Sequence, residues 1–364
     1  MYSTPGESES RFRVPSRYST RDWWTILLGT PKSRVLRRIR HPMMFTAAWS
    51  ALILGLYRIV PLPQFSFLPH NLIGSALSLL LVFRTNAAYT RFWEGGKRWQ
   101  MLSDNVRSLS RMVMLYRDQV GRRRTERVVR LMCAFPVVLK QYLRGNVLED
   151  VSGLSHLLTE ADCASLRRVK NKPLHVTNLL AQQLRAVPDT TLHGTDLPLF
   201  SSRERLAMLK IVSDLSDCIG ACERIVQTPI PFHYSRHTSR LATLFVNTLP
   251  FVLVRDLGLL LIPTMAILCW ALFGIQEIGL MIEEPFRETL QLDHMCTSIQ
   301  RDIVETLECA APTRYDERYD KQEKQEEAPP FHQEEEEAGR RIVHARARVV
   351  TMESAVARGV RTSV

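Results

Sequence analysis

The sequence predicts an all-α membrane protein. Long apolar segments alternate with strongly charged ones, and basic residues gather at the ends of the apolar segments. In the charged regions, apolar residues recur every third or fourth position, which is the period of an amphipathic helix. The averages of 45% hydrophobic and 23% charged residues conceal this pattern, because the two kinds of residue are segregated along the chain.

Charge and cysteine content narrow the class of protein. The net charge of +11 and the pI of about 9.5 suit an anionic partner: a nucleic acid, a membrane surface or an anionic substrate. The seven cysteines include no CxxC pair, so free thiols in a reducing compartment are expected rather than a disulfide or zinc framework. The N-terminal residues have no apolar core and are not a secretory signal, whereas a transit peptide stays open.

The membrane prediction depends on four apolar segments, at about 43–61, 68–83, 241–254 and 257–282. A spanning helix needs about 20 apolar residues, so the second segment is long enough only if its helix continues past Arg84. Pro250 interrupts the third segment, which turns into the fourth at 255–258 and forms a helical hairpin. A soluble protein with buried helices is the alternative, but residues 257–276 carry no charge. We therefore expect membrane helices at about 43–61, 68–90, 239–254 and 257–282.

The distribution of basic residues predicts the orientation in the membrane. Nine basic residues precede the first apolar segment, only Arg58 stands near its end, where it gives way to the second, and four follow the second up to Arg98. The positive-inside rule then places both termini and the region 84–240 on one side. That side is the cytoplasm or its equivalent, such as a plastid stroma.

The region between the second and third segments is predicted to be soluble and helical. Apolar residues recur at spacings of four and three along one helix, and this seam contains Leu102, Val106, Leu109, Val113, Tyr116 and Val120. Further helices are expected at about 124–144 and 202–227. The last of these opens with a capping-box pattern, Ser201-x-x-Glu204. The domain organisation we expect is a basic arm over 1–41, a main domain over 42–312 with soluble helices at about 97–238 and 286–312, and a disordered tail over 313–364.

Enzyme signatures are absent from the sequence. There is no P-loop and no GxSxG motif, and no acidic pair has the partners that acid–base chemistry needs. His233 and His237 are four residues apart, as metal ligands on a helix are, but no Glu stands between them and Pro231 precedes them. We expect a protein that is not an enzyme and holds no cofactor.

The second apolar segment has a polar side. On a helix of about 100° per residue, one face of 71–86 holds Asn71, Ser75, Ser78, Leu79, Val82 and Asn86, with Leu72 and Phe83 at its edge. The opposite face holds Ile73, Leu77, Leu80, Leu81 and Arg84. In a membrane, such a stripe either packs closely against another helix or lines a water-filled path. Spacing alone favours helix packing slightly over a pore.

Three stretches resemble a known family, the bestrophins. The signature of that family, an apolar helix followed by a run similar to F-R-x-N-x-x-Y-x-R-W-W-E, resembles residues 79–99, LLLVFRTNAAYTRFWEGGKRW. The segment leading into its third membrane helix is similar to 222–241, CERIVQTPIPFHYSRHTSRL. The end of its fourth helix is similar to 273–286, FGIQEIGLMIEEPF. The resemblance covers roughly residues 20–310.

This resemblance implies an anion channel. The family forms homopentamers around one axial pore, with four membrane helices per subunit and a large helical domain on the cytosolic side. Its second membrane helix lines a narrow neck, whose positions fall here on Ser75, Leu79 and Phe83. With this resemblance the pore interpretation replaces helix packing, and Asn71, Ser78, Val82 and Asn86 become pore-lining residues that contact anions. Ser75 departs from the bulky apolar residue that is common there, which predicts a wider and wetter ring.

The resemblance implies further site residues. Arg84 supplies positive potential near the pore, and a second constriction falls near Arg203 when residues are counted back without gaps from the PIP motif. Animal members hold calcium in an acidic cluster after the fourth helix. The corresponding residues here are Glu283, Glu284, Glu288 and Asp293, which lack the dense acidic run, so we expect no full calcium clasp.

The pattern is closer to plant and algal thylakoid members, which are voltage-dependent chloride channels. The implied partners are further copies of the chain, membrane lipids and monovalent anions (chloride or bicarbonate), with no nucleic acid. The implied location is the thylakoid membrane of the chloroplast, with both termini in the stroma. Two other interpretations remain. One is a membrane-anchored interaction or scaffold protein with a vestigial pore, and the other is a membrane enzyme, for which the sequence contains no supporting motif.

Overall fold

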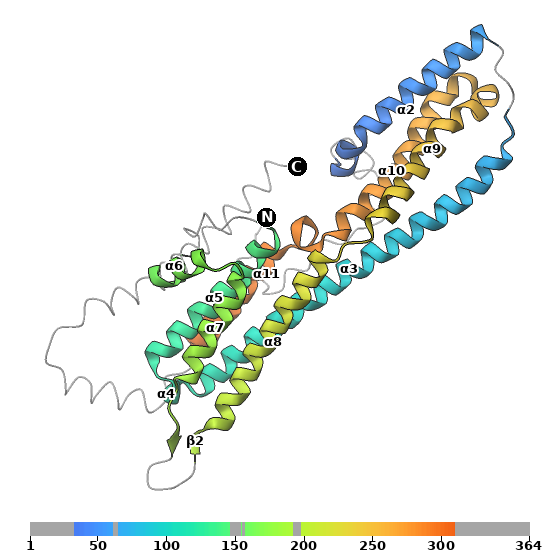
Figure 1. Ribbon diagram of the computed structural model, residues 1–364. Coiled ribbons are helices and arrows are strands. Elements are labelled where there is room, and N and C mark those ends of the chain that lie inside the picture. The colour runs from blue at the N-terminus through green and yellow to red at the C-terminus, as the bar shows by residue number, and fades with distance from the viewer. Residues whose placement is uncertain (1–32, 61–64, 146–153, 155–156, 192–197, 310–364) are drawn as a thin grey trace, which may run out of the picture. The chain divides into compact units, whose positions relative to one another are not determined.

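The computed structural model describes residues 33–60, 65–145, 154, 157–191 and 198–309, and these are almost entirely helical (Figure 1). The predicted tail and most of the predicted basic arm lie outside the described residues. The described chain forms two compact units. One contains the residues up to Ile73 together with Ala242–Glu277, and the other contains Gly74–Leu241 and the residues from Ile278 onward.

The first unit holds the most apolar helices. These are α2 (Arg34–Ile59), the start of α3 (Leu68–Leu115), most of α9 (Phe232–Leu257), the 3-10 turn η4 (Gly258–Leu260) and most of α10 (Leu261–Glu283). Their core contains Ile53, Leu54, Val246, Leu249, Val254, Leu261, Met265 and Cys269. Two polar contacts join α2 to the hairpin: Trp49 Nε1 donates to the Asn247 carbonyl at 2.9 Å, and Arg38 pairs with Glu277 at 2.9 Å.

The predicted hairpin of the third and fourth segments is present, with its turn slightly later in the chain. Arg255 and Asp256 belong to the last turn of α9, and the chain reverses at Gly258–Leu260. Gly258 has a φ of +50°, a conformation that costs a residue without a Cβ little. The glycine rather than the charged pair therefore sets the turn.

Two helices are longer than their apolar segments. Helix α2 begins at Arg34 rather than near 43, and α9 begins at Phe232 rather than near 239. Apolar length marks only the part of a helix that suits a bilayer core, and polar residues extend a helix beyond it. Pro42 lies inside α2 without ending it. Thr46 Oγ1 donates to the Pro42 carbonyl at 2.8 Å, a common use of a threonine hydroxyl inside a helix.

The second unit is a helical domain. Besides α3 and α8 (Ser202–Gln227) it contains α4 (Arg117–Val120), α5 (Arg122–Leu143), α6 (Glu160–Arg168), α7 (Lys172–Arg185), the π-helical turn η5 (Pro285–Thr289) and α11 (Leu292–Cys309). Helices α5 and α7 lie side by side, as do α7 and α8 (Figure 1). Leu102, Val106, Leu109 and Val113 of the predicted seam are completely buried in this core. The helix ends at Leu115, so the last two residues of the seam lie beyond it, Tyr116 directly before α4 and Val120 within α4.

The sequence predicted the bounds of α8 correctly. Its predicted capping box is formed as well: the Ser201 backbone N–H donates to Glu204 Oε2 at 2.8 Å. Prolines and other turn signals over 145–200 predicted turns and loops between α5 and α8, but the structure has α6 and α7 there. A short antiparallel pair follows them, β1 (Thr190–Thr191) with β2 (Pro198–Phe200). Phe200 is buried and meets the Tyr116 ring edge-on at 5.5 Å between centroids, so this pair anchors to the helical core.

Three stretches of the described chain are long and apolar enough to cross a membrane. They are Arg34–Ile59, Leu68–Leu115 and Ser202–Glu283, and the last contains α8, α9 and α10. The first two contain the predicted first and second membrane helices, and the third contains the predicted hairpin. The number of four crossings stays a prediction.

Candidate functional site: the exposed face of helix α3

Helix α3 is one unbroken helix of 48 residues. The sequence predicted a membrane helix over about 68–90 and soluble helices from about 97, and the structure places both predicted segments in this one helix. Pro69 lies in the first turn, where proline is tolerated, and no other proline follows within the helix. A continuous helix transmits its register, so residues about 18 positions apart, or about five turns, lie on the same side.

One side of α3 is buried from Leu77 to Val113. Leu77, Leu81 and Ala88 begin this buried face, and Trp99, Leu102 and Val106 continue it. All of these side chains are at most 5% exposed. The helix is therefore held against its own chain by one fixed side, and the opposite side is left for other contacts.

The predicted polar stripe occupies the exposed side. All of its members are exposed: Asn71, Ser75, Ser78, Leu79, Val82 and Asn86. Leu79 and Phe83 are 56% and 58% exposed, although both are large and apolar. The helical projection thus separated the two sides of α3 as the structure does. That this face lines a pore stays a prediction.

The polar groups of the stripe differ in their hydrogen bonds. Ser78 Oγ donates to the Gly74 carbonyl at 2.8 Å, which is a common use of a serine hydroxyl inside a helix. The side-chain amide of Asn86 makes no hydrogen bond within the described residues, while its backbone carbonyl accepts from Thr90 Oγ1 at 2.9 Å. Asn86 can therefore offer its amide N–H groups to a solute at the end of the stripe.

Arg84 lies on the buried side, one residue beyond Phe83. Its side chain is 2% exposed, and Nε and Nη1 have no hydrogen-bond partner among the described residues. No carboxylate of the described chain pairs with it. No ion pair within the described residues therefore offsets the side chain of Arg84. Arg84 lies behind the stripe rather than on it, and its role as a positive charge near a pore stays a prediction.

Arg91 joins three parts of the second unit. Its Nε donates to the Glu283 carbonyl at 3.2 Å, and its two terminal nitrogens donate to the carbonyls of Thr228 and Ile225. Those last two carbonyls lie at the C-terminal end of α8. Carbonyls at the end of a helix have no backbone N–H of the same helix from which to accept a hydrogen bond. Arg91 therefore caps α8 with a charged fork and fixes the turn that follows it to α3.

Gly95 lets η5 approach α3 closely. A Cβ at this position would lie 2.9 Å from Pro285 Cγ and 3.4 Å from the Phe286 ring. Glu283 completes the contact, because its carboxylate accepts from the Ile230 backbone N–H at 3.1 Å. The three stretches of sequence that resembled bestrophins therefore meet at one junction. Sequence reasoning missed the roles of Arg91 and Gly95, although their place inside the signature was a signal for them.

The acidic residues considered as calcium ligands do not come together in one cluster among the described side chains. Glu283 is buried and engaged with Ile230, and Glu284 pairs with Arg287 at 3.0 Å. Asp293 pairs with Lys140 at 2.7 Å and with Arg144 at 3.2 Å. The side chain of Glu288 lies outside what the structure describes, and no group of three metal-binding side chains occurs among the described residues.

The pKa of the Asp293 carboxyl reflects these contacts. Partial burial opposes its ionisation, but hydrogen bonds and attraction from Lys140 and Arg144 outweigh burial and hold the pKa below its ordinary value. Asp293 therefore ties α11 to the end of α5 as an anion at neutral pH.

Arg203 lies in the first turn of α8 with an exposed side chain, and its backbone N–H donates to the capping Ser201 Oγ at 3.3 Å. The structure brings it into no contact with the stripe of α3. A second constriction at Arg203 stays a prediction.

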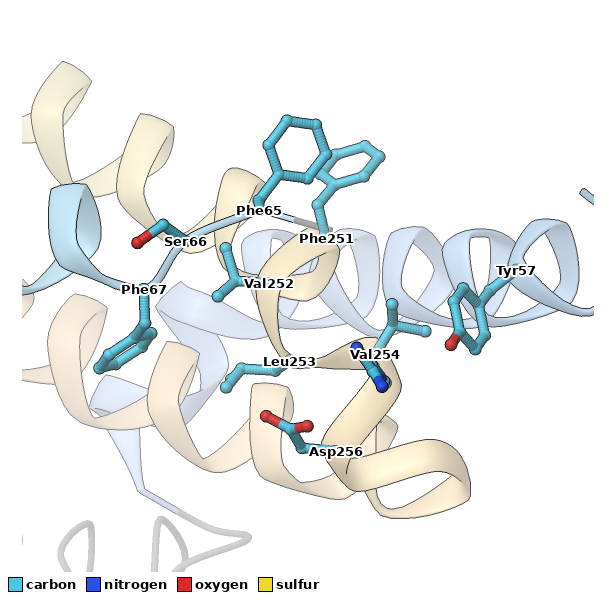
Figure 2. A pocket seen from close by; sticks show the side chains of 10 residues that line it. Tyr57, Phe65, Ser66, Phe67, Phe251, Val252, Leu253, Val254 and Asp256 are labelled. Carbon is cyan, nitrogen blue, oxygen red and sulfur yellow. The ribbon is translucent and has the colours of Figure 1, made fainter. Parts of the chain in front are cut away.

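A pocket of about 660 Å³ lies in the first unit, at the end of α9 (Figure 2). Phe65 and Phe251 meet edge to face in its wall, with ring centroids 6.3 Å apart. Asp256 also lines it, and its carboxylate is exposed. None of the predicted site residues is part of this pocket.

The comparisons with known proteins agree with this arrangement. A family model described as "Bacterial/Fungal Bestrophin protein" matches residues 15–305. A voltage-dependent anion channel-forming protein of Nostoc sp. is 32% identical over 287 residues, which is 77% of this chain and 90% of the relative. Voltage-dependent chloride channel 2, chloroplastic, of Arabidopsis thaliana is 32% identical over 77% of this chain and 68% of the relative.

Solved structures share the fold. A crystal structure of a bacterial bestrophin homolog from Klebsiella pneumoniae superposes with a TM-score of 0.64 at 23% identity, and covers 74% of this chain and 98% of that one. Helical hairpins, a long helix with one exposed face and homologues named as anion channels define the class: this is a channel protein and not an enzyme. The chain belongs to the bestrophin family.

Proposed function

We propose that this chain forms an anion-selective, voltage-dependent channel that conducts chloride through a homopentameric pore. The neck of the pore consists of Ser75, Leu79 and Phe83 from each subunit. The observation that carries the proposal is the exposed face of α3, where large apolar side chains stand on one side of a helix whose other side is packed into the chain.

Such a face calls for a specific environment. In a membrane, lipid accepts apolar side chains but not a stripe that also holds Asn71, Ser75 and Asn86. Rings of Leu79 and Phe83 around an axis would make an apolar constriction that gates by losing its water, and the polar residues would face the water on either side. The positive edges of the Phe83 rings would stabilise a partly dehydrated anion.

Arg84 gives the neck a positive electrostatic potential. Its charge has no counter-carboxylate within the described residues, and a charge in a low-dielectric surrounding acts over a longer distance than one in water. One such charge per subunit, directly behind Phe83, would favour anions over cations in the neck. Chloride and bicarbonate share the charge on which this preference depends, so both are proposed as permeant ions.

The proposed location is the thylakoid membrane, with both termini in the stroma. Two relatives are named chloroplastic, and the basic residues at the start of α2 and after the neck suit that orientation. Protease access to the tail in sealed vesicles of known orientation checks it. Cleavage of residues 313–364 from the lumenal side would contradict the orientation.

Currents from purified protein in planar bilayers test the proposed function. Phe83→Ala and Leu79→Ala widen the constriction and should change gating or rectification, because fewer apolar groups then drive water out of the neck. Leu80→Ala makes the same chemical change on the half-buried side of α3 and should leave the current–voltage relation unchanged. A silent bilayer containing intact oligomers would favour the membrane-anchored scaffold instead.

A further inference from the structure

The exposed face of α3 does not end with the neck. Counting about 18 residues, or about five turns, from Leu79 leads to Lys97 on the same side of the helix. Between them, Thr90 and Trp93 are also exposed, while Ala88, Gly95 and Trp99 lie on the buried side. One surface therefore runs from the neck into the helical domain without a change of register.

Trp93 and Lys97 form a pair on this surface. The Lys97 Nζ lies 5.8 Å from the centroid of the Trp93 ring, within the range of a cation–π contact. Both side chains are exposed, and Trp93 is 55% exposed despite its size. A contact of this kind at an exposed site is weak, so it favours a position of the ammonium group over the ring without fixing it there.

The charge of Lys97 is not neutralised by a neighbour. No carboxylate of the described chain forms an ion pair with its Nζ. The nearest acidic residue in sequence, Glu94, is engaged by Arg98 at 2.7 Å and lies 4.0 Å from Arg224. These four groups therefore carry a net positive charge at this level of α3.

Farther along the same face stands one carboxylate, Asp104. It accepts from Gln100 Nε2 at 2.9 Å and lies 3.7 Å from Arg107 Nη1, so its charge is partly offset within its own helix. Asp104 is about two turns beyond Lys97, or about 10 Å along the axis. Lys97 thus lies between the neck and Asp104, and the acidic residue nearer to the neck, Glu94, is paired with Arg98.

We propose that Trp93 and Lys97 line the conduction path beyond the neck and form an anion-concentrating station about 15 to 21 Å along α3 from Phe83. This inference rests on the proposed pore. The ammonium group raises the local anion concentration, and the exposed indole N–H offers a hydrogen bond to a passing halide or oxyanion. A ring of such pairs, one from each subunit, controls the rate at which anions enter the pore from the side of the helical domain.

Single-channel conductance in planar bilayers tests the station. Lys97→Gln should lower anion entry from the side of the helical domain about two- to fivefold at low salt, and Lys97→Glu should lower it further. The loss should shrink near 1 M salt, where charges act over only about 3 Å. Lys170→Gln makes the same change on an exposed turn between α6 and α7 and should conduct as the wild type does.

Chemical restoration separates charge from folding. Lys97→Cys is assembled first and then treated with a positively charged or a negatively charged methanethiosulfonate, and the wild type treated alike reports on the native cysteines. The positive reagent should restore conductance and the negative one should lower it. Equal conductance of the wild type, Lys97→Glu and both modified forms at low salt would overturn the station while leaving the pore intact. A silent wild type would instead contradict the proposed function itself.

Discussion

Single side chains decide how the junction of the three motifs is held. The Arg91 guanidinium satisfies two carbonyls at the end of α8 and the carbonyl of Glu283, and only a planar fork reaches all three. Sequence periodicity could not have shown this, because the contacts join residues more than 130 positions apart. Its importance was visible only as part of a motif.

Removing that fork should destabilise the helical domain. Arg91→Ala leaves carbonyls without donors, and we expect the free energy of unfolding to fall by about 2 kcal/mol, with part of it regained in Arg91→Lys. Thermal unfolding of the detergent-solubilised protein, followed by circular dichroism, measures this. Arg122→Ala is the control, since its ion pair with Glu126 is exposed and worth little. Equal melting of the two alanine variants would refute the capping role.

The two adjacent glycines of α3 offer a second test at this scale. Gly95→Ala should destabilise the protein by about 1 to 3 kcal/mol, because the new methyl group would meet Pro285 at 2.9 Å. Gly96→Ala has nothing within 4 Å of its Cβ and should stabilise the helix by up to about 1 kcal/mol. The same melting experiment compares them. A stabilised Gly95→Ala would show that η5 does not pack as described.

At the scale of elements, the sequence predicted the sides of α3 but not its length. The polar stripe has a period that a projection reveals, and the exposed side matches it. The apolar character of the sequence ends near Phe83, and it predicted a membrane helix over about 68–90 and soluble helices from about 97 without showing that the two are one helix. Tertiary packing supports the continuous helix beyond the apolar segment, since Gly95 is buried against η5 and Trp99 is buried in the core. The pore stays a prediction because it requires other copies of the chain.

The attachment of α11 to α5 should weaken in acid. The Asp293 pKa is lowered in the folded state, so its contribution to stability is present at neutral pH and is lost as pH falls below about 4. We expect the melting temperature of the wild type to drop over that range. Asp293→Asn should melt lower at pH 7 and change less in acid. Parallel pH profiles for the two proteins would contradict the role given to Asp293.

At the scale of the whole molecule, the chain consists of a unit with the most apolar helices, a helical domain and one helix, α3, that has residues in both. The family assignment follows from matches over most of the chain. The ion, the assembly and the membrane are proposals that reach beyond a single chain. All three depend on the exposed face of α3 meeting water and its own copies around an axis.

The reversal potential of the purified wild-type protein in a potassium chloride gradient tests this central claim most directly. An anion pore with an apolar neck backed by Arg84 should reverse near the equilibrium potential of chloride, and the current should persist when potassium is replaced by a large organic cation. A reversal near the equilibrium potential of potassium, or no current from intact oligomers, would contradict it.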